Sequence, residues 1–364
     1  MLFRSVLWAL ATMGEKADRG LLEAMQRRAT ATAGEFDPQG VANLLWALTT
    51  MGGKVDQGLL EAMQRRATAT AGCFKPQEVS NVLWALATMG ERADRALLEA
   101  VATHATATVA VFHPQDVANL LWALTVMGEG VNGVLGVLID RLAARVLELH
   151  DQLTVQCKSQ LHQWLVSCEL DLVSGTSLPS GVARVKQEMG EECLQAFSGQ
   201  TTCDSRLQRE VAAALRRAVP ELEIGEEYSD ARSGYSIDVL VRRRSAAGSS
   251  SGSESPVKPF GEWAVEVDGP THFLGDGRTP SGSTLLKRKQ LGQLGYTVVP
   301  VPFWEWNAQR GEEAKRRYIE DSLREGGGNA EQQIGEGRLP APVGDRPRDS
   351  KPRGSMGQPL TACP

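Results

Sequence analysis

Residues 36–48 read Phe-Asp-Pro-Gln-Gly-Val-Ala-Asn-Leu-Leu-Trp-Ala-Leu, and close copies of this stretch begin again at Phe74 and at Phe112. Each copy begins 38 residues after the previous one. The same register is kept by Trp8, Trp46, Trp84 and Trp122, and by Gly14, Gly52, Gly90 and Gly128. A fixed period of this length indicates stacked supersecondary units. The sequence therefore predicts an α-helical solenoid of helix-turn-helix repeats over residues 1–150.

Each unit has the start and stop signals of two helices. Pro38 suits a first helical turn, and Asp37 before it is a good N-cap. Apolar residues at helical spacing follow, and Gly52 is placed to end the helix. A second helix is expected from Asp56, and the equivalent cap positions are Asp18, Asp94 and Asn132.

The polar residues that recur in the array leave two interpretations open. Asn43, Asn81 and Asn119 share one register position. An asparagine there either bonds a loop carbonyl of the next unit or reads a base edge, as helical-repeat RNA binders do. Trp46 is expected to pack between neighbouring helices. A second set of recurring residues, expected to align into a basic stripe, consists of Arg27, Arg28, Arg65 and Arg66.

Composition narrows the class of protein. The net charge of −5 is not that of a generally basic protein, so any polyanion must bind to local patches. The six cysteines form no C-x-x-C pair and are expected to be reduced thiols. No apolar run has the roughly 20 residues that span a bilayer, so no membrane partner is expected.

The rest of the chain divides by its pattern. Met1 falls where Gln39 stands in the next unit, so the first repeat is truncated, and a targeting peptide is expected to be missing. Residues 151–203 are interpreted as a degenerate repeat with a helical connector, 204–324 as an α/β domain, and 325–364 as a disordered tail. A Ser/Gly-rich stretch from Ser245 to Ser255 is interpreted as a flexible loop.

Within the α/β domain, one stretch carries most of the chemistry. It reads Trp-Ala-Val-Glu-Val-Asp-Gly-Pro-Thr-His-Phe over residues 263–273. Because side chains alternate along a strand, Glu266 and Asp268 are expected on one face, at the strand's end. Further strands are expected over 235–241 and 296–301, with helices over 205–218, 283–294 and 312–323. The strand–helix–strand order predicts some parallel pairing.

Several uncommon clusters in this domain resemble a known family. They are Ser236-Ile237-Asp238, Val265 to Pro270 with His272-Phe273, Leu286-Lys287-Arg288, Gly295-Tyr296 and Phe303-Trp304-Glu305-Trp306. In this order they resemble a RAP domain, and the array is similar to the octotricopeptide-type repeats that accompany RAP domains, including in FAST-kinase-like proteins. The resemblance implies RNA binding in a mitochondrion or chloroplast, with roles in RNA processing, stability, rRNA maturation or translation. It also implies RNA, and other RNA-processing proteins, as partners.

RAP domains also resemble the PD-(D/E)xK nuclease fold, which implies a candidate site. Asp238 and Glu266 take the two acid positions, and Asp268 stands where that fold has its lysine. The three acids are candidate ligands of Mg²⁺ or Mn²⁺. On a helical wheel Lys287 falls on the arc that faces the sheet and Arg288 falls outside it. Lys287 is either a substitute catalytic lysine or a snorkelling side chain.

Other residues of this domain are candidate RNA contacts. His272 either contacts phosphate or acts as an acid, or it bonds the backbone as a loop histidine. Trp304 and Trp306 either divide into one core residue and one base-stacking residue or both pack on the sheet edge. Arg288 is a further candidate contact.

Three hypotheses follow. The first is an organellar RNA-binding protein, the second an active metal-dependent endoribonuclease using Asp238, Glu266, Asp268 and Lys287, and the third a protein-interaction scaffold.

Overall fold

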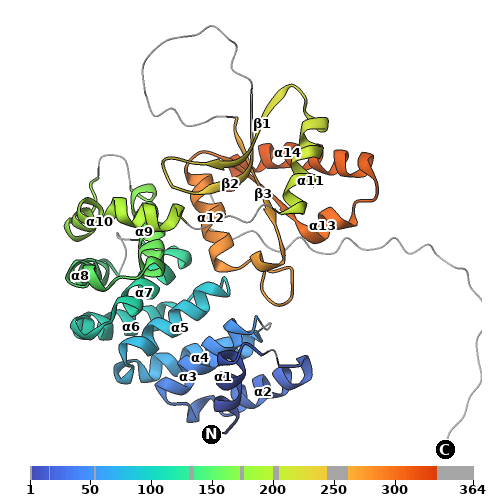
Figure 1. Ribbon diagram of the computed structural model, residues 1–364. Helices are drawn as coiled ribbons and strands as arrows, with labels where there is room; N and C mark the ends of the chain where they lie inside the picture. Colours follow the sequence, from blue (N-terminus) through green and yellow to red (C-terminus); the bar gives the residue numbers. More distant parts are fainter. Residues whose placement is uncertain are drawn as a thin grey trace, which may run out of the picture.

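The computed structural model describes residues 2–15, 17–52, 55–130, 135–172, 176–199, 205–243 and 261–333. A helical array is followed by a small α/β domain, as the repeat and the strand pattern predict (Figure 1). None of the helices in these ranges is long and apolar enough to cross a membrane.

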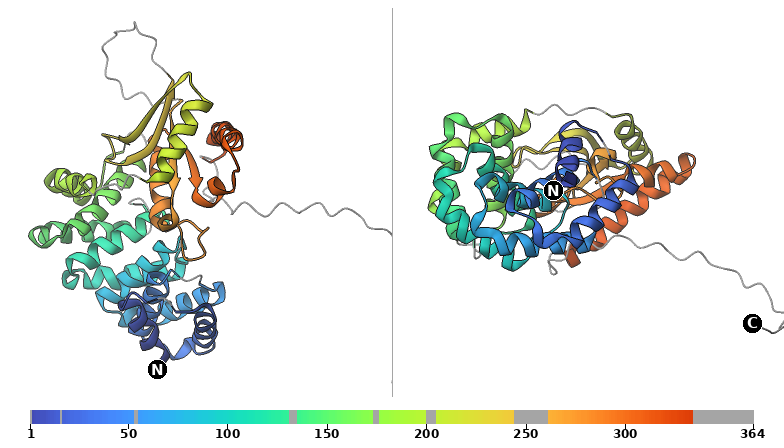
Figure 2. Two further views of the ribbon diagram at one scale, coloured as in Figure 1. Left: turned by 45° about the vertical axis from the view of Figure 1, so that its right-hand side comes forward. Right: turned by 90° about the horizontal axis from the view of Figure 1, so that it is seen from below.

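The array is built from two stacked layers of helices. The inner helices are α1 (Leu2–Thr12), α3 (Pro38–Thr50), α5 (Pro76–Thr88), α7 (Pro114–Met127) and α9 (Val155–Leu170). The outer helices are α2 (Arg19–Ala31), α4 (Gln57–Thr70), α6 (Arg95–Thr108), α8 (Gly136–Glu148) and α10 (Ser180–Ser198). Each inner helix packs on the next inner helix, and the outer helices follow the same order. The result is an arc of paired helices (Figure 2).

The expected caps are formed. The Asp37 carboxylate accepts a hydrogen bond from the Gly40 amide at 2.8 Å, and Asp18, Asp56 and Asp94 cap their helices in the same way. Gly52, after α3, has a φ of +67°, a left-handed conformation that favours glycine. The expected cap Asn132 lies outside the described residues.

The fifth unit is a complete helix pair. Leu153 takes the place that Phe112 has in the fourth unit, after a step of 41 residues instead of 38. α10, expected as part of a connector, packs against α9 and α8 as the outer helix of this unit. The array therefore extends to Ser198.

The α/β domain contains a four-stranded sheet in the order β1 (Leu222–Ser229), β2 (Ser236–Arg243), β3 (Trp263–Asp268) and β4 (Thr297–Pro302). The first three strands are antiparallel, and β3 and β4 are parallel as predicted. The connecting helix is α12 (Gly282–Gln293). The remaining helices are α11 (Arg206–Ala218), α13 (Phe303–Ala308) and α14 (Glu312–Gln333).

Two parts of this domain differ from expectation. Strand β1 was not predicted, because its polar sequence Leu-Glu-Ile-Gly-Glu-Glu-Tyr-Ser has no clear alternation and it lies at a sheet edge. Helix α14 extends to Gln333, into the tail that was expected to be disordered. Residues 334–364 and the expected loop at 245–255 lie outside the described residues.

Helix α12 lies between the sheet and the array. Its residue Leu291 belongs to a core with Ala264 and Tyr296 of the sheet side, and its residue Leu286 belongs to the array core. The helix contacts α5, α7 and α9, so it occupies the inner side of the arc (Figures 1 and 2). The opposite face of the sheet is covered by α11 and α14.

Candidate functional site

Three carboxylates come together on the sheet face that α12 covers. The pairing of Leu240 with Ala264 sets Asp238 of β2 beside Glu266 of β3, on the same face. Glu266 and Asp268 project to this face as predicted, and both are buried, with 2% and 1% of their surface exposed. The Asp238 carboxylate accepts a hydrogen bond from the Val267 amide at 2.7 Å.

Cations from α12 and one histidine meet these acids. The Lys287 ammonium contacts the Oε2 atom of Glu266, so its side chain points toward the sheet as predicted. The Arg288 guanidinium lies 2.5 Å from Asp268 Oδ2, and His272 Nδ1 lies 3.2 Å from Asp268 Oδ1. The expectation that Arg288 falls outside the site-facing arc is wrong, because its long side chain reaches back to the end of β3.

Burial and nearby carboxylates raise the pKa values of several groups in the cluster. Burial raises the pKa of Glu266 to about 7 and raises the pKa of Asp238. Burial alone lowers the pKa of Lys287, but the carboxylates of Glu266 and Asp238 outweigh this effect and leave it above its usual value. The hydrogen bond to Asp268 raises the pKa of His272.

The acids are poorly arranged for a divalent metal. Both oxygens of Asp268 are engaged, one by Arg288 and one by His272. One oxygen of Glu266 contacts Lys287, and one oxygen of Asp238 accepts from a backbone amide. The single buried carboxylate oxygen left without a partner is Glu266 Oε1, among the residues described. Within those residues no set of three or more acid, histidine or cysteine side chains is placed to hold a metal. The cluster fits internal neutralisation by Lys287 and Arg288 better than it fits a metal centre.

The outer edge of this cluster is rigid and aromatic. The His272 carbonyl accepts hydrogen bonds from the Ser281 amide and the Thr284 hydroxyl, both at 2.9 Å, while its ring remains partly exposed. The half-buried Trp304 ring packs on Phe273 at 4.3 Å between centroids. Trp306 is fully buried in the sheet core, so of the two tryptophans it is the core residue, and its place among the candidate RNA contacts is corrected.

The basic residues of the array lie apart from its asparagines. Asn43, Asn81 and Asn119 are on inner helices, whereas the exposed Arg27, Arg28 and Arg65 are on the outer helices α2 and α4.

Arg66 does not join this basic stripe. Its guanidinium donates to the Phe36 carbonyl, and His104 and Arg145 make the same contact with Phe74 and Phe112. In the second, third and fourth units this position therefore ties the two helices together, and the assignment of Arg66 to RNA binding is corrected.

A buried polar network joins the array to the α/β domain, and the sequence did not predict it. Gln290 of α12 accepts from the Tyr235 hydroxyl at 2.6 Å and donates to the Ser167 hydroxyl and the Gln163 carbonyl, each at 2.7 Å. Gln163 in turn donates to the Tyr235 hydroxyl and accepts from the Trp122 indole, each at 2.9 Å. One signal was available, because Gln163 stands where the earlier units have tryptophan.

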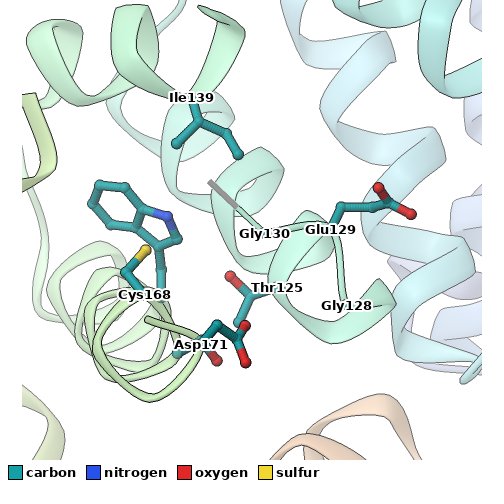
Figure 3. Close-up of a pocket in the computed structure, with 9 residues that line it drawn as sticks. Thr125, Gly128, Glu129, Gly130, Ile139, Cys168 and Asp171 are labelled. Atoms are coloured by element: carbon teal, nitrogen blue, oxygen red, sulfur yellow. The ribbon is translucent and has the colours of Figure 1, made fainter. Parts of the chain in front are cut away.

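Near this junction, a small cavity lies between α7, α8 and α9 (Figure 3). Thr125, Ile139, Cys168 and Asp171 are among its lining residues. Its volume of about 10 Å³ leaves room for no more than one water molecule, so it is not a metabolite site.

Both parts of the chain are similar to known protein families. The RAP domain family model matches residues 265–322, which include most of the charged cluster. The model of a protein family of unknown function, DUF1601, matches residues 15–45, 54–83 and 90–121, one match per repeat. Among curated proteins, the chain is similar to the Fas-activated serine/threonine kinase of Mus musculus, with 40% identity over 52 residues. That match covers 14% of this chain and 10% of the relative.

Proposed function

We propose that this helical-repeat protein with a C-terminal RAP domain binds single-stranded RNA in a mitochondrion or chloroplast and acts there in RNA processing, stability, rRNA maturation or translation. The observation that carries the proposal is the RAP domain match, because it covers Glu266, Asp268, His272, Lys287 and Arg288 in one stretch. Other RNA-processing proteins are proposed as further partners.

The edge of the charged cluster has the chemistry that RNA requires. His272 is partly exposed and carries a raised pKa, so it offers a proton to a phosphate oxygen. Trp304, held on Phe273, offers an aromatic edge beside it. These features support phosphate and base contacts at the end of β3.

Binding is favoured over metal-dependent cleavage. Of the two acids at the metal positions of a PD-(D/E)xK nuclease, Glu266 is paired here with Lys287, and Asp238 accepts a hydrogen bond from a backbone amide. Asp268, at the lysine position, is paired with Arg288. A divalent ion would have to displace Lys287 from the buried Glu266. A protein-interaction scaffold is the alternative that RNA-binding measurements test.

The direct test is the affinity of the full chain for labelled homopolymeric oligoribonucleotides across a series of salt concentrations. Phosphate contacts predict that affinity falls as salt rises, with a log–log slope clearly below zero. A slope near zero, or no binding at all, contradicts the proposal and favours the scaffold. In the same samples, RNA cleavage that depends on Mg²⁺ or Mn²⁺ and is lost in Asp238→Ala would show that the protein is a nuclease.

The pH dependence of RNA binding tests the role of His272. Its pKa is raised by Asp268, so the ring stays protonated to a pH above its usual value of 6.5. RNA affinity is expected to fall as pH rises through this higher value, because the positive charge is lost. His272→Gln is expected to bind severalfold more weakly at low pH and to lose this step. An unchanged pH profile in that variant would exclude His272 from the RNA contact.

A further inference from the structure

Each inner helix presents the same three polar and aromatic positions along one face. We call these residues the inner strip, and in the central units they lie four and seven residues apart, the spacing of one helix face. The inner strip consists of Gln39, Asn43 and Trp46 on α3, Gln77, Asn81 and Trp84 on α5, and Gln115, Asn119 and Trp122 on α7.

The inner strip is closed where α7 meets α9. The Asn119 carbonyl oxygen accepts hydrogen bonds from Gln115 at 2.8 Å and from Gln160 at 3.0 Å. Gln115 also donates to Gln160 at 3.1 Å, so the three amides form a ring of contacts. The Trp122 indole donates to Gln163, and only 6% of the Trp122 surface is exposed. These groups have found partners within the protein.

The closure follows from the way the fifth unit departs from the repeat. Gln160 stands where the second, third and fourth units have asparagine, and Gln163 stands where they have tryptophan. Packed helices lie roughly 8–10 Å apart, and the extra methylene of glutamine lets Gln160 span that gap where asparagine falls short. Gln163 supplies an acceptor that an indole lacks. Tyr235 and Gln290 of the α/β domain then cover Gln163.

The inner strip is open on α3 and α5. The side-chain amides of the half-buried Asn43 and Asn81 make no hydrogen bond to any group within the described ranges. Trp46 and Trp84 pack against the array core on one side but stay partly exposed. An amide at this exposure can bond water, and a fixed partner that replaces the water contributes about 0.5–1.5 kcal/mol per hydrogen bond. Two adjacent units therefore hold an unpaired amide one helical turn from an indole.

We propose that the inner strip of α3 and α5 is a binding site for unpaired RNA bases, one base per unit, and that the inner strip of α7 is its closed end. The amide of Asn43 or Asn81 would bond a base edge, and the neighbouring indole would support the base face. This inference rests on the proposed RNA-binding function and narrows it to two units. RNA is favoured over a protein partner because each unit repeats one amide and one flat ring in the same register.

The test compares three matched variants of the full chain, Asn43→Ala, Asn81→Ala and Asn119→Ala, on homopolymeric oligoribonucleotides. Loss of one base contact at α3 or α5 is expected to weaken binding about two- to tenfold. Asn119→Ala is expected to leave RNA affinity within about twofold and to lower the melting temperature, because Gln115 and Gln160 lose their acceptor. Since amides carry no charge, the salt slope of all three is expected to equal that of the parent.

The outcomes separate this inference from the function on which it rests. If the parent binds RNA but Asn81→Ala and Asn43→Ala bind as well as the parent, the proposed base-binding role of the inner strip is wrong and the RNA-binding function stands. The strip is also wrong if Asn119→Ala weakens binding as much as the other two. If the parent binds no RNA, both fail. Photocrosslinking of the parent to 4-thiouridine RNA gives an independent measurement, with crosslinked peptides expected from α3 and α5 and none from α7.

Discussion

At the residue scale, Glu266 is the most consequential side chain of the charged cluster. It is 2% exposed, it contacts Lys287 through one oxygen, and its other oxygen is buried without a partner in the described part of the chain. Asp238 and Asp268 add negative charge around it, against the two cations from α12. The site therefore favours a proton on Glu266 at a pH where a free glutamate has lost it.

The pH dependence of stability tests this environment. The folded pKa of Glu266 is about 7, above its ordinary value of 4.5, so the folded state holds this proton more tightly than the unfolded state. The contribution of Glu266 to the free energy of unfolding is complete below about pH 4.5 and is lost as pH rises through about 7. Glu266→Gln mimics the protonated form. Between pH 4.5 and pH 7, the free energy of unfolding of the variant minus that of the parent is expected to rise by on the order of 2 kcal/mol.

Thermal unfolding of parent and variant across this pH range measures the difference. Glu221→Gln is a suitable control, because Glu221 is an exposed glutamate in the same domain and its carboxylate has no hydrogen-bond partner among the described residues. A difference in melting temperature between Glu266→Gln and the parent that does not change with pH would show that Glu266 is ionised throughout.

Part of this site followed from the sequence, and part did not. The alternation of β3 placed Glu266 and Asp268 on one face, and the helical wheel brought Lys287 to them. The contact of Arg288 with Asp268 was not predicted, because a helical wheel shows only the direction in which a side chain leaves the helix. The long arginine side chain bends from that direction to reach Asp268. The sequence left open which of Trp304 and Trp306 is the core residue, because the local pattern does not show which ring another helix will cover.

At the element scale, α12 connects the two domains through its two faces. One face carries Leu291 and Lys287 toward the sheet, and the other carries Leu286 and Gln290 toward the array. Strand β1 shows the opposite case, an element that sequence pattern could not reveal because its side chains are mostly polar and only one of its edges is paired. The other edge strand, β4, was predicted because its sequence is apolar.

Two glycines of α12 provide a matched test of this packing. A Cβ atom added to Gly282 would lie 1.9 Å from the Ala87 carbonyl oxygen of α5, whereas one added to Gly292 meets nothing within 4 Å. Gly282→Ala is expected to destabilise the protein by about 1–3 kcal/mol, because backbone must move. Gly292→Ala is expected to stabilise it by about 0.5–1 kcal/mol through helix propensity. Denaturant unfolding measures both, and equal effects would contradict the close approach of α12 to α5.

At the scale of the whole molecule, the array and the α/β domain are expected to unfold together. The repeat sequence predicted the array, and the cluster of motifs predicted the second domain, but nothing in either pattern places one against the other. That placement depends on residues from distant parts of the chain, with Gln290 bonded to Tyr235, Ser167 and Gln163. Such contacts have no local sequence period, and the sequence shows only that Gln163 departs from the repeat tryptophan, not which residues it contacts.

Gln290 and Gln293 offer a matched test of the docked arrangement. Gln290 is fully buried and serves three partners, whereas the exposed Gln293 makes one hydrogen bond, to Asp171 at 2.7 Å. Gln290→Leu keeps the size but strands buried polar groups on both domains, so a loss on the order of 2–4 kcal/mol is expected. Gln293→Leu is expected to change stability by less than about 0.5 kcal/mol. The parent should melt in one transition and Gln290→Leu in two, with the array and the sheet followed by hydrogen exchange. A single transition at the same temperature for both variants would mean that this network does not hold the domains together.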